Sequence, residues 1–150
     1  LPGERIGYVV VPDEVENADQ VIDGIVVSNR TLGFVNAPSL LQKAVAKCLD
    51  EKTNLAFYDE NRKMLYEGLQ KLGFHCIKPE GAFYMWVKSP DADEEKFVAA
   101  GKKYNIIMVK GSAFGCAGYV RLAYWGFPLT VKNALTAFEK LAEDYGLYTE

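Results

Sequence analysis

Two arginines of this sequence occupy positions where a permanent positive charge is costly. Arg5 precedes the apolar run of residues 6–11, and Arg121 lies among the apolar residues of the segment 119–124. A guanidinium stays protonated in proteins and is rarely buried without a partner. Spacing alone favours an arginine at a sheet edge whose head reaches solvent or pairs with an acidic side chain. The functional alternative is an anion-binding arginine, because the planar fork matches a carboxylate or a phosphate.

Other residue types give weaker chemical signals. Gly111, Gly115 and Gly118 are spaced as in a flexible turn before Arg121, without the pattern of a dinucleotide-binding or nucleoside-triphosphate loop. The sequence contains one histidine and no Ser-His-Asp or paired-carboxylate pattern. We therefore expect no metal site, three buried and reduced cysteines, and a mostly structural role for the aromatic residues 83, 84 and 86.

Bulk composition narrows the class of protein. The chain has 150 residues, of which 49% are hydrophobic and 25% charged, and this balance is ordinary for a globular domain. Its net charge of −3 argues against nucleic acid or an anionic membrane as the main partner. The sequence shows neither a membrane-spanning apolar run nor a signal peptide, so we expect a cytoplasmic protein.

Apolar periodicity and turn residues indicate a mixed fold. The expected helices cover residues 19–27, 39–49, 59–72, 91–104 and 130–145, and the expected strands cover 5–11, 74–78, 82–88, 106–109 and 119–124. The two strands around residues 79–81 form a predicted hairpin. This order indicates an α/β or α+β fold with at least part of the sheet antiparallel, and the first strand is expected to belong to a different sheet.

Five short segments, in order along the chain, resemble class I/II (fold type I) pyridoxal-phosphate-dependent aminotransferases. They are LPGERIGY at 1–8, NAPS at 36–39, PEGAFY at 79–84, GSAFG at 111–115 and GYVRL at 118–122. The resemblance runs from residue 1 to the last helix. It implies that Arg5 contacts the phosphate of the cofactor, pyridoxal 5′-phosphate, and that Arg121 pairs with the α-carboxylate of the substrate. Phe83 is a further expected residue on the substrate side.

The resemblance also implies how the chain is divided. Residues 1–55 are expected to be the end of a large cofactor-binding domain, and residues 56–150 a small C-terminal domain with helices packed on a mixed or antiparallel sheet. The lysine that carries the cofactor is expected a few residues before Leu1. No catalytic residue is therefore expected within the chain, and the isolated fragment is expected to be inactive.

The function implied for the full-length parent is the transfer of an amino group between an amino acid and a 2-oxo acid. The parent is expected to be a homodimer. Two alternatives remain open: a stand-alone, non-enzymatic binding or regulatory module, and a C–S lyase or decarboxylase of the same fold.

Overall fold

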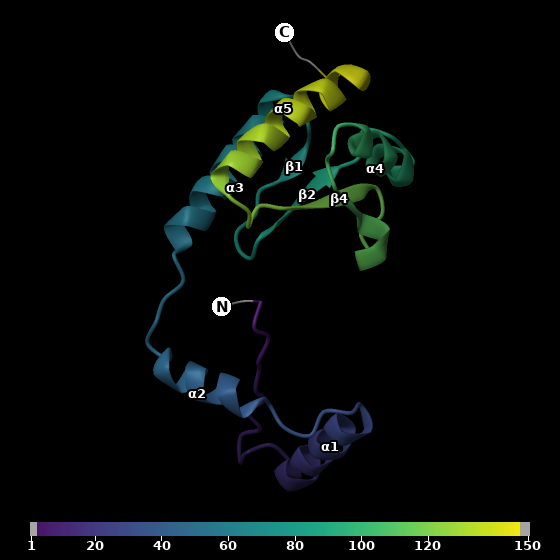
Figure 1. The fold of residues 1–150 in the computed structure, drawn as a ribbon. Coiled ribbons are helices and arrows are strands. Elements are labelled where there is room, and N and C mark those ends of the chain that lie inside the picture. The colour runs from purple at the N-terminus through teal and green to yellow at the C-terminus, as the bar shows by residue number, and fades with distance from the viewer. Residues whose placement is uncertain (1–2, 148–150) are drawn as a thin grey trace. The chain divides into compact units, whose positions relative to one another are not determined.

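The structure is a computed structural model that describes residues 3–147. The chain divides into two compact units, a first unit of Leu1–Lys52 and a second unit of Thr53–Glu150 (Figure 1). Residues 1 and 2, which open the first family-like segment, lie outside the described residues.

The first unit contains two helices, α1 (Ala18–Thr31) and α2 (Ser39–Lys47), and neither has a buried residue. The helix expected to start with the segment 36–39 is present. Its N-cap is Pro38, and Gln42 donates through Nε2 to the carbonyl of Ala37 at 2.7 Å. The side chain of Gln42 therefore ties the start of the helix to the loop before it.

The strand predicted for residues 5–11 is wrong. This segment has no regular secondary structure, and Tyr8, Val9 and Val10 are exposed. An extended segment becomes a strand only when a neighbour accepts and donates its backbone hydrogen bonds. Among residues 3–147, all the paired strands belong to the second unit. The apolar pattern alone therefore did not make this segment a strand.

The second unit is built on an antiparallel sheet with the strand order β1-β2-β4-β3. Its strands are β1 (Cys76–Ile77), β2 (Tyr84–Lys88), β3 (Val109–Lys110) and β4 (Tyr119–Ala123). The predicted hairpin is present as β1 and β2, although its arms are shorter and its loop longer than expected. This mixed α/β fold with an antiparallel sheet confirms the predicted fold class.

Three helices cover one face of this sheet: α3 (Leu55–Lys71), α4 (Glu94–Lys103) and α5 (Pro128–Asp144). Figure 1 shows α3 and α5 running side by side along the sheet. They approach closely at Gly68, where an added Cβ would lie 2.5 Å from a methyl of Leu135. A larger residue at position 68 would therefore require the side chain of Leu135 to move.

The core lies between the helices and the inward side chains of β2 and β4. It includes Met85, Val87, Val120 and Leu122 from the strands. The helices contribute the residues that the 3.6-residue period predicted, with Leu65 and Leu69 from α3, Phe97 from α4, and Phe138 and Leu141 from α5. Phe74 links them, because its ring lies 5.5 Å from Phe138 and 6.1 Å from Phe97.

Alternation along β2 and β4 leaves the other face of the sheet open. Tyr84, Trp86 and Lys88 of β2 stand opposite Ala123, Arg121 and Tyr119 of β4. None of these six residues is buried, so the expectation that the aromatic residues of this arm belong mostly to the core is wrong. Period 2 sends Tyr84 and Trp86 to the face opposite Met85 and Val87.

The difference in burial predicts a difference in hydrogen exchange. Amides of α3, α5 and β4 should exchange slowly and together, because opening them exposes the shared core. Amides of α1 and α2 should exchange faster, because no buried side chain holds either helix. Mass spectrometry after deuterium labelling, on a chain shown to be monomeric by light scattering, would measure this. Equal or greater protection in the first unit would contradict the prediction.

Candidate functional site

The most prominent feature of the open face is the environment of Arg121. Its Cζ lies 4.1 Å from the ring centre of Tyr84 and 3.9 Å from that of Phe114. Tyr84 comes from β2, whereas Phe114 comes from the 3₁₀ turn η1 (Gly111–Phe114) before β4. Both contacts are of the cation–π type, which favours a guanidinium lying over an aromatic face.

Arg121 has no acidic partner among residues 3–147. The ion pairs in that range join Asp59 to Arg62 and Lys63, and Lys110 to Glu95. Arg121 is half-buried. Two rings lie against its guanidinium while its N–H groups remain without a carboxylate. These groups are therefore the part of Arg121 that can bind an anion.

The loop that carries Phe114 is held by one carboxylate. Glu94, at the start of α4, accepts hydrogen bonds from the backbone N–H of Ser112 at 3.0 Å and of Gly118 at 2.8 Å. The two amides lie near opposite ends of residues 111–118. Glu94 is 8% exposed, and within residues 3–147 it is the one charged residue that is buried. The carboxylate of Glu94 thus links the two ends of the loop through their backbone amides.

The same loop also requires glycine at its first residue. A Cβ on Gly111 would lie 2.0 Å from the carbonyl oxygen of Cys116 and 2.6 Å from that of Tyr119. Backbone atoms cannot yield as a flexible side chain can. The sequence pattern had marked this glycine as a turn residue, and the structure gives the reason as a close backbone contact.

The hydrogen bonds from Ser112, followed by that from Gly118, hold the pKa of Glu94 below its usual value, and the charge of Lys110 acts in the same direction. The carboxylate is therefore ionised at neutral pH. Hydrogen bonds to a charged acceptor are about twice as strong as neutral ones, which suits Glu94 to restraining a glycine-containing loop.

A second network fixes the residues before β2. The hydroxyl of Tyr124 donates to the carbonyl of Ala82 at 2.9 Å, and its backbone N–H donates to the carbonyl of Phe83 at 3.0 Å. Asn61, completely buried in α3, donates in turn to the carbonyls of Tyr124 and Gly126. Ala82 has a φ of 58°, which is unusual for a residue other than glycine. The network holds this backbone in place.

Phe83 lies apart from the rings around Arg121. It is half-buried against Tyr58, with 4.9 Å between ring centres, and lines a cavity of about 390 Å³. Asp59, Arg62 and Glu80 are the charged residues of that cavity, and Arg121 is not among its lining residues. Tyr84, the next residue, is the one that contacts the guanidinium.

Arg5 lines a cavity in the first unit. The cavity measures about 280 Å³ and is also formed by Ile6, Gly7, Asn29 and residues 34–38. Arg5 is exposed and has no ion-pair partner among the described residues. A permanent cation and two asparagine side chains, of Asn29 and Asn36, are groups that can donate hydrogen bonds to a phosphate. The residues present therefore fit such an anion.

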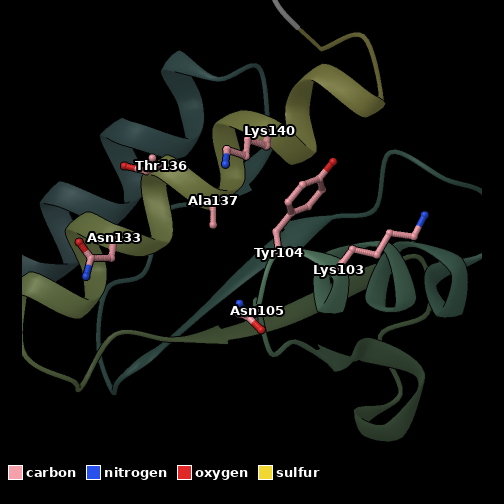
Figure 2. A pocket seen from close by; sticks show the side chains of 7 residues that line it. All are labelled: Lys103, Tyr104, Asn105, Asn133, Thr136, Ala137 and Lys140. Atoms are coloured by element: carbon pink, nitrogen blue, oxygen red, sulfur yellow. The ribbon is translucent and has the colours of Figure 1, made fainter.

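The second unit has two further cavities. The first, of about 280 Å³, is shown in Figure 2, where the ammonium groups of Lys103 and Lys140 lie on opposite sides of Tyr104 and do not converge. The hydroxyl of Tyr104 donates to Asp144. The second measures about 590 Å³ and has no charged residue in its lining, which includes the exposed Trp125 and Phe127. Neither resembles a reaction centre.

The three cysteines differ in burial. Only Cys76 is buried, whereas Cys48 is exposed and Cys116 half-buried, so the expectation of three buried thiols is wrong. Burial raises the pKa of the Cys76 thiol to about 12. Within residues 3–147, no three His, Cys, Asp or Glu side chains gather as metal ligands would, and no helix is long and apolar enough to cross a membrane.

Sequence reasoning found Arg121 but missed Glu94, Tyr84 and Phe114 as its surroundings. The sequence predicted a helix over residues 91–104, and α4 begins at Glu94, with Asp93 as its N-cap. Glu94 lies one helical turn before the core residue Phe97, so its position on the inner face of the helix could have been predicted. Its partners could not, because Ser112 and Gly118 are 18 and 24 residues away.

Comparison with known proteins shows the family of this chain. The family described as aminotransferase class I and II matches residues 1–138, so the chain belongs to that family. An LL-diaminopimelate aminotransferase of Lachnospira eligens is 28% identical over 149 residues, covering 93% of this chain. An aspartate aminotransferase of Pyrococcus abyssi is 33% identical over 155 residues, covering 95%.

Among solved structures, an aminotransferase of Eubacterium rectale matches with a TM-score of 0.87 and 44% identity over 97% of this chain. The chain spans 36% of the length of that protein. It spans the same share, 36%, of the two relatives from Lachnospira eligens and Pyrococcus abyssi. The residues matched by the family model, 1–138, include all five segments on which the resemblance was based.

The anchoring of the loop by Glu94 predicts a pH-dependent change. Folding lowers the pKa of Glu94, so its ionised carboxylate stabilises the folded loop fully above pH 4.5. This stabilisation is lost as the pH falls through the lowered pKa of the folded state. The amide resonances of Ser112 and Gly118 should therefore shift together with a midpoint below pH 4.5. Amides of α5 should not move in that step. A midpoint above 4.5, or no shift before global unfolding, would contradict the prediction.

Proposed function

We propose that this chain supplies the substrate-carboxylate and cofactor-phosphate contacts of a pyridoxal-phosphate-dependent aminotransferase. The observation that carries the proposal is Arg121, which lies between two aromatic rings without an acidic partner among the described residues. Membership of the aminotransferase class I and II family supports it. All amino acids share an α-carboxylate, so one fixed arginine can serve any of them.

Arg121 acts by binding and orientation. With rings against its guanidinium, a planar carboxylate can approach along the N–H edge, where two parallel hydrogen bonds form. This fixes the rotation of the amino acid about its Cα and thereby directs the Cα–H bond. Positioning of this kind contributes to the rate by holding the reacting bond in the productive geometry.

Arg5 is the proposed contact of the cofactor phosphate. Its cavity contains a cation that stays charged at every relevant pH, and the asparagines add neutral donors. Pyridoxal phosphate, when bound, supplies the electron sink for amino-group transfer, and the protein supplies its orientation. Arg5 would anchor one end of the cofactor.

Several finer assignments remain proposals. We propose a homodimeric, cytoplasmic parent that uses amino-acid and 2-oxo-acid substrates, with residues 1–55 ending its large domain and 56–150 forming its small domain. Phe83 is proposed to line the substrate side through the cavity that it shares with Tyr58. A C–S lyase of the same fold is the second candidate, because a carboxylate-binding arginine serves it equally well.

Variants of the two arginines in the full-length enzyme test the proposal. Arg121→Ala should lower kcat/KM by about 30- to 5,000-fold for every amino-acid substrate, because truncating a buried charge pair costs roughly 2–5 kcal/mol. Arg121→Lys should also be poor, since an ammonium cannot reproduce the fork. Retention of cofactor should be nearly unchanged, as measured by absorbance after gel filtration.

Arg5→Ala is the matched control, because it removes the same charge elsewhere. It should weaken retention of the cofactor first and spare the affinity for substrate once cofactor is in excess. The roles are wrong if Arg121→Ala keeps near-normal kcat/KM, or if it releases the cofactor while substrate affinity is spared. Release of pyruvate and ammonia from a β-thio amino acid, in place of amino-group transfer, would support the lyase.

The 150-residue chain by itself should turn over no substrate and should bind pyridoxal phosphate covalently at no single lysine. None of the residues that line the Arg5 cavity is a lysine. Incubation with the cofactor, borohydride reduction and peptide mass mapping would measure this. Scattered adducts on surface lysines are expected, because a free aldehyde reacts with many amines. Stoichiometric labelling of one lysine would contradict the prediction.

A further inference from the structure

We propose that Glu94 is a positioning residue of the carboxylate site, acting through the loop 111–118 to keep the ring of Phe114 over the guanidinium of Arg121. This inference rests on the proposed function, because the site that it positions is the proposed substrate-carboxylate site.

The first step is the direction of the Glu94 side chain. Each carboxylate oxygen accepts one backbone N–H, Oε1 from Ser112 and Oε2 from Gly118. Glu94 forms no ion pair within residues 3–147, since the neighbouring Lys110 pairs with Glu95. The carboxylate is therefore committed to the loop, and no cation competes for it among those residues.

The second step is the dependence of Phe114 on its backbone. Its ring is 49% exposed, so core packing does not hold it. The ring of Phe114 contacts the guanidinium of Arg121, with 3.9 Å from its centre to Cζ, and packs at a steep angle against Trp86, with 5.9 Å between ring centres. An exposed ring keeps such a position only if the backbone beneath it is fixed. Glu94 bonds the loop on both sides of Phe114.

The third step is the consequence for Arg121. Without Phe114, the guanidinium would keep the ring of Tyr84 and lose the second ring against it, and the long side chain would regain rotamers that turn the fork away from a bound carboxylate. Asp93 and Glu95 flank Glu94 in the sequence, and the charge of Lys110 on β3 acts on its carboxylate. None of them bonds the loop amides in its place.

Glu94→Gln is a sharp test of this role. Glutamine has nearly the same shape, but only its side-chain oxygen accepts a hydrogen bond. Its NH2 group would face the backbone N–H of either Ser112 or Gly118, and two donors cannot bond to each other. The matched control is Glu95→Gln, which removes one negative charge from the same helical turn, keeps a side-chain oxygen that can still accept from Lys110, and leaves the loop bonds intact. Phe114→Leu removes the ring and leaves the anchor.

The first measurement is a double-mutant cycle in the full-length enzyme. Glu94→Gln should lower kcat/KM about 10-fold, mainly through KM, because a charge-assisted hydrogen bond is lost. In a Phe114→Leu background the same change should cost less than about 2-fold, because both act on the same contact. Glu95→Gln should stay within about 2-fold of the wild type.

The second measurement needs no activity. In a Trp125→Phe background, Trp86 is the only tryptophan of the 150-residue chain, and it touches Phe114. Glu94→Gln should shift its emission to longer wavelength as the ring of Phe114 leaves, and Glu95→Gln should not. Circular dichroism of each variant shows whether the fold is kept.

The outcomes separate this inference from the proposed function. Unchanged Trp86 emission in a folded Glu94→Gln variant would overturn the positioning role alone. The same holds if Glu94→Gln lowers kcat/KM by the same factor with and without Phe114→Leu, because the two residues would then act independently. If Arg121→Ala spares substrate use, the proposed function fails and this inference is overturned with it. A shifted emission together with non-additive losses in kcat/KM supports both.

Discussion

The antiparallel pairing of β2 with β4 is the constraint on which the rest of the second unit depends. Its register places Trp86 opposite Arg121 and Met85 opposite Leu122. The alternation of side chains along these strands therefore determines both the core and the open face. The inward residues complete a core with α3, α4 and α5, and the outward residues collect a cation and aromatic rings on the open face. A slip of one residue would bury Arg121 and expose the core.

The core and the site are joined at the ends of these strands. Tyr124 follows β4, and its hydroxyl and backbone hold the residues that lead into β2, while Asn61 ties Tyr124 to α3. Glu94 performs the corresponding task for the loop before β4. In both places a buried polar side chain of a helix satisfies backbone groups of a loop. Loops without regular hydrogen bonds need such partners, because an unpaired polar group is costly to bury.

The two proposed anion contacts differ in how they are built. Arg121 lies on a strand, packed between rings, so its position follows from a rigid sheet. Arg5 lies in a segment without regular structure, beside a small cavity. A substrate that must be oriented for proton transfer benefits from the first kind of contact. An anchor for a phosphate needs charge and donors more than a fixed direction, and the second kind provides them.

The sequence by itself determined the fold class and the five helices, because periodicity and turn residues are local signals. It also marked Arg121 as a candidate, as a cation within an apolar segment, although its anion-binding role was implied only by the family resemblance. It failed for residues 5–11, where an apolar run predicts a strand but pairing requires a neighbour. It could not find Glu94 or Phe114 as part of the site. Glu94 bonds residues 18 and 24 positions away, and Phe114 reaches Arg121 only because the loop folds back over the sheet. Contacts of this kind are decided by the tertiary structure, since no local pattern encodes which distant backbone groups a buried carboxylate will meet.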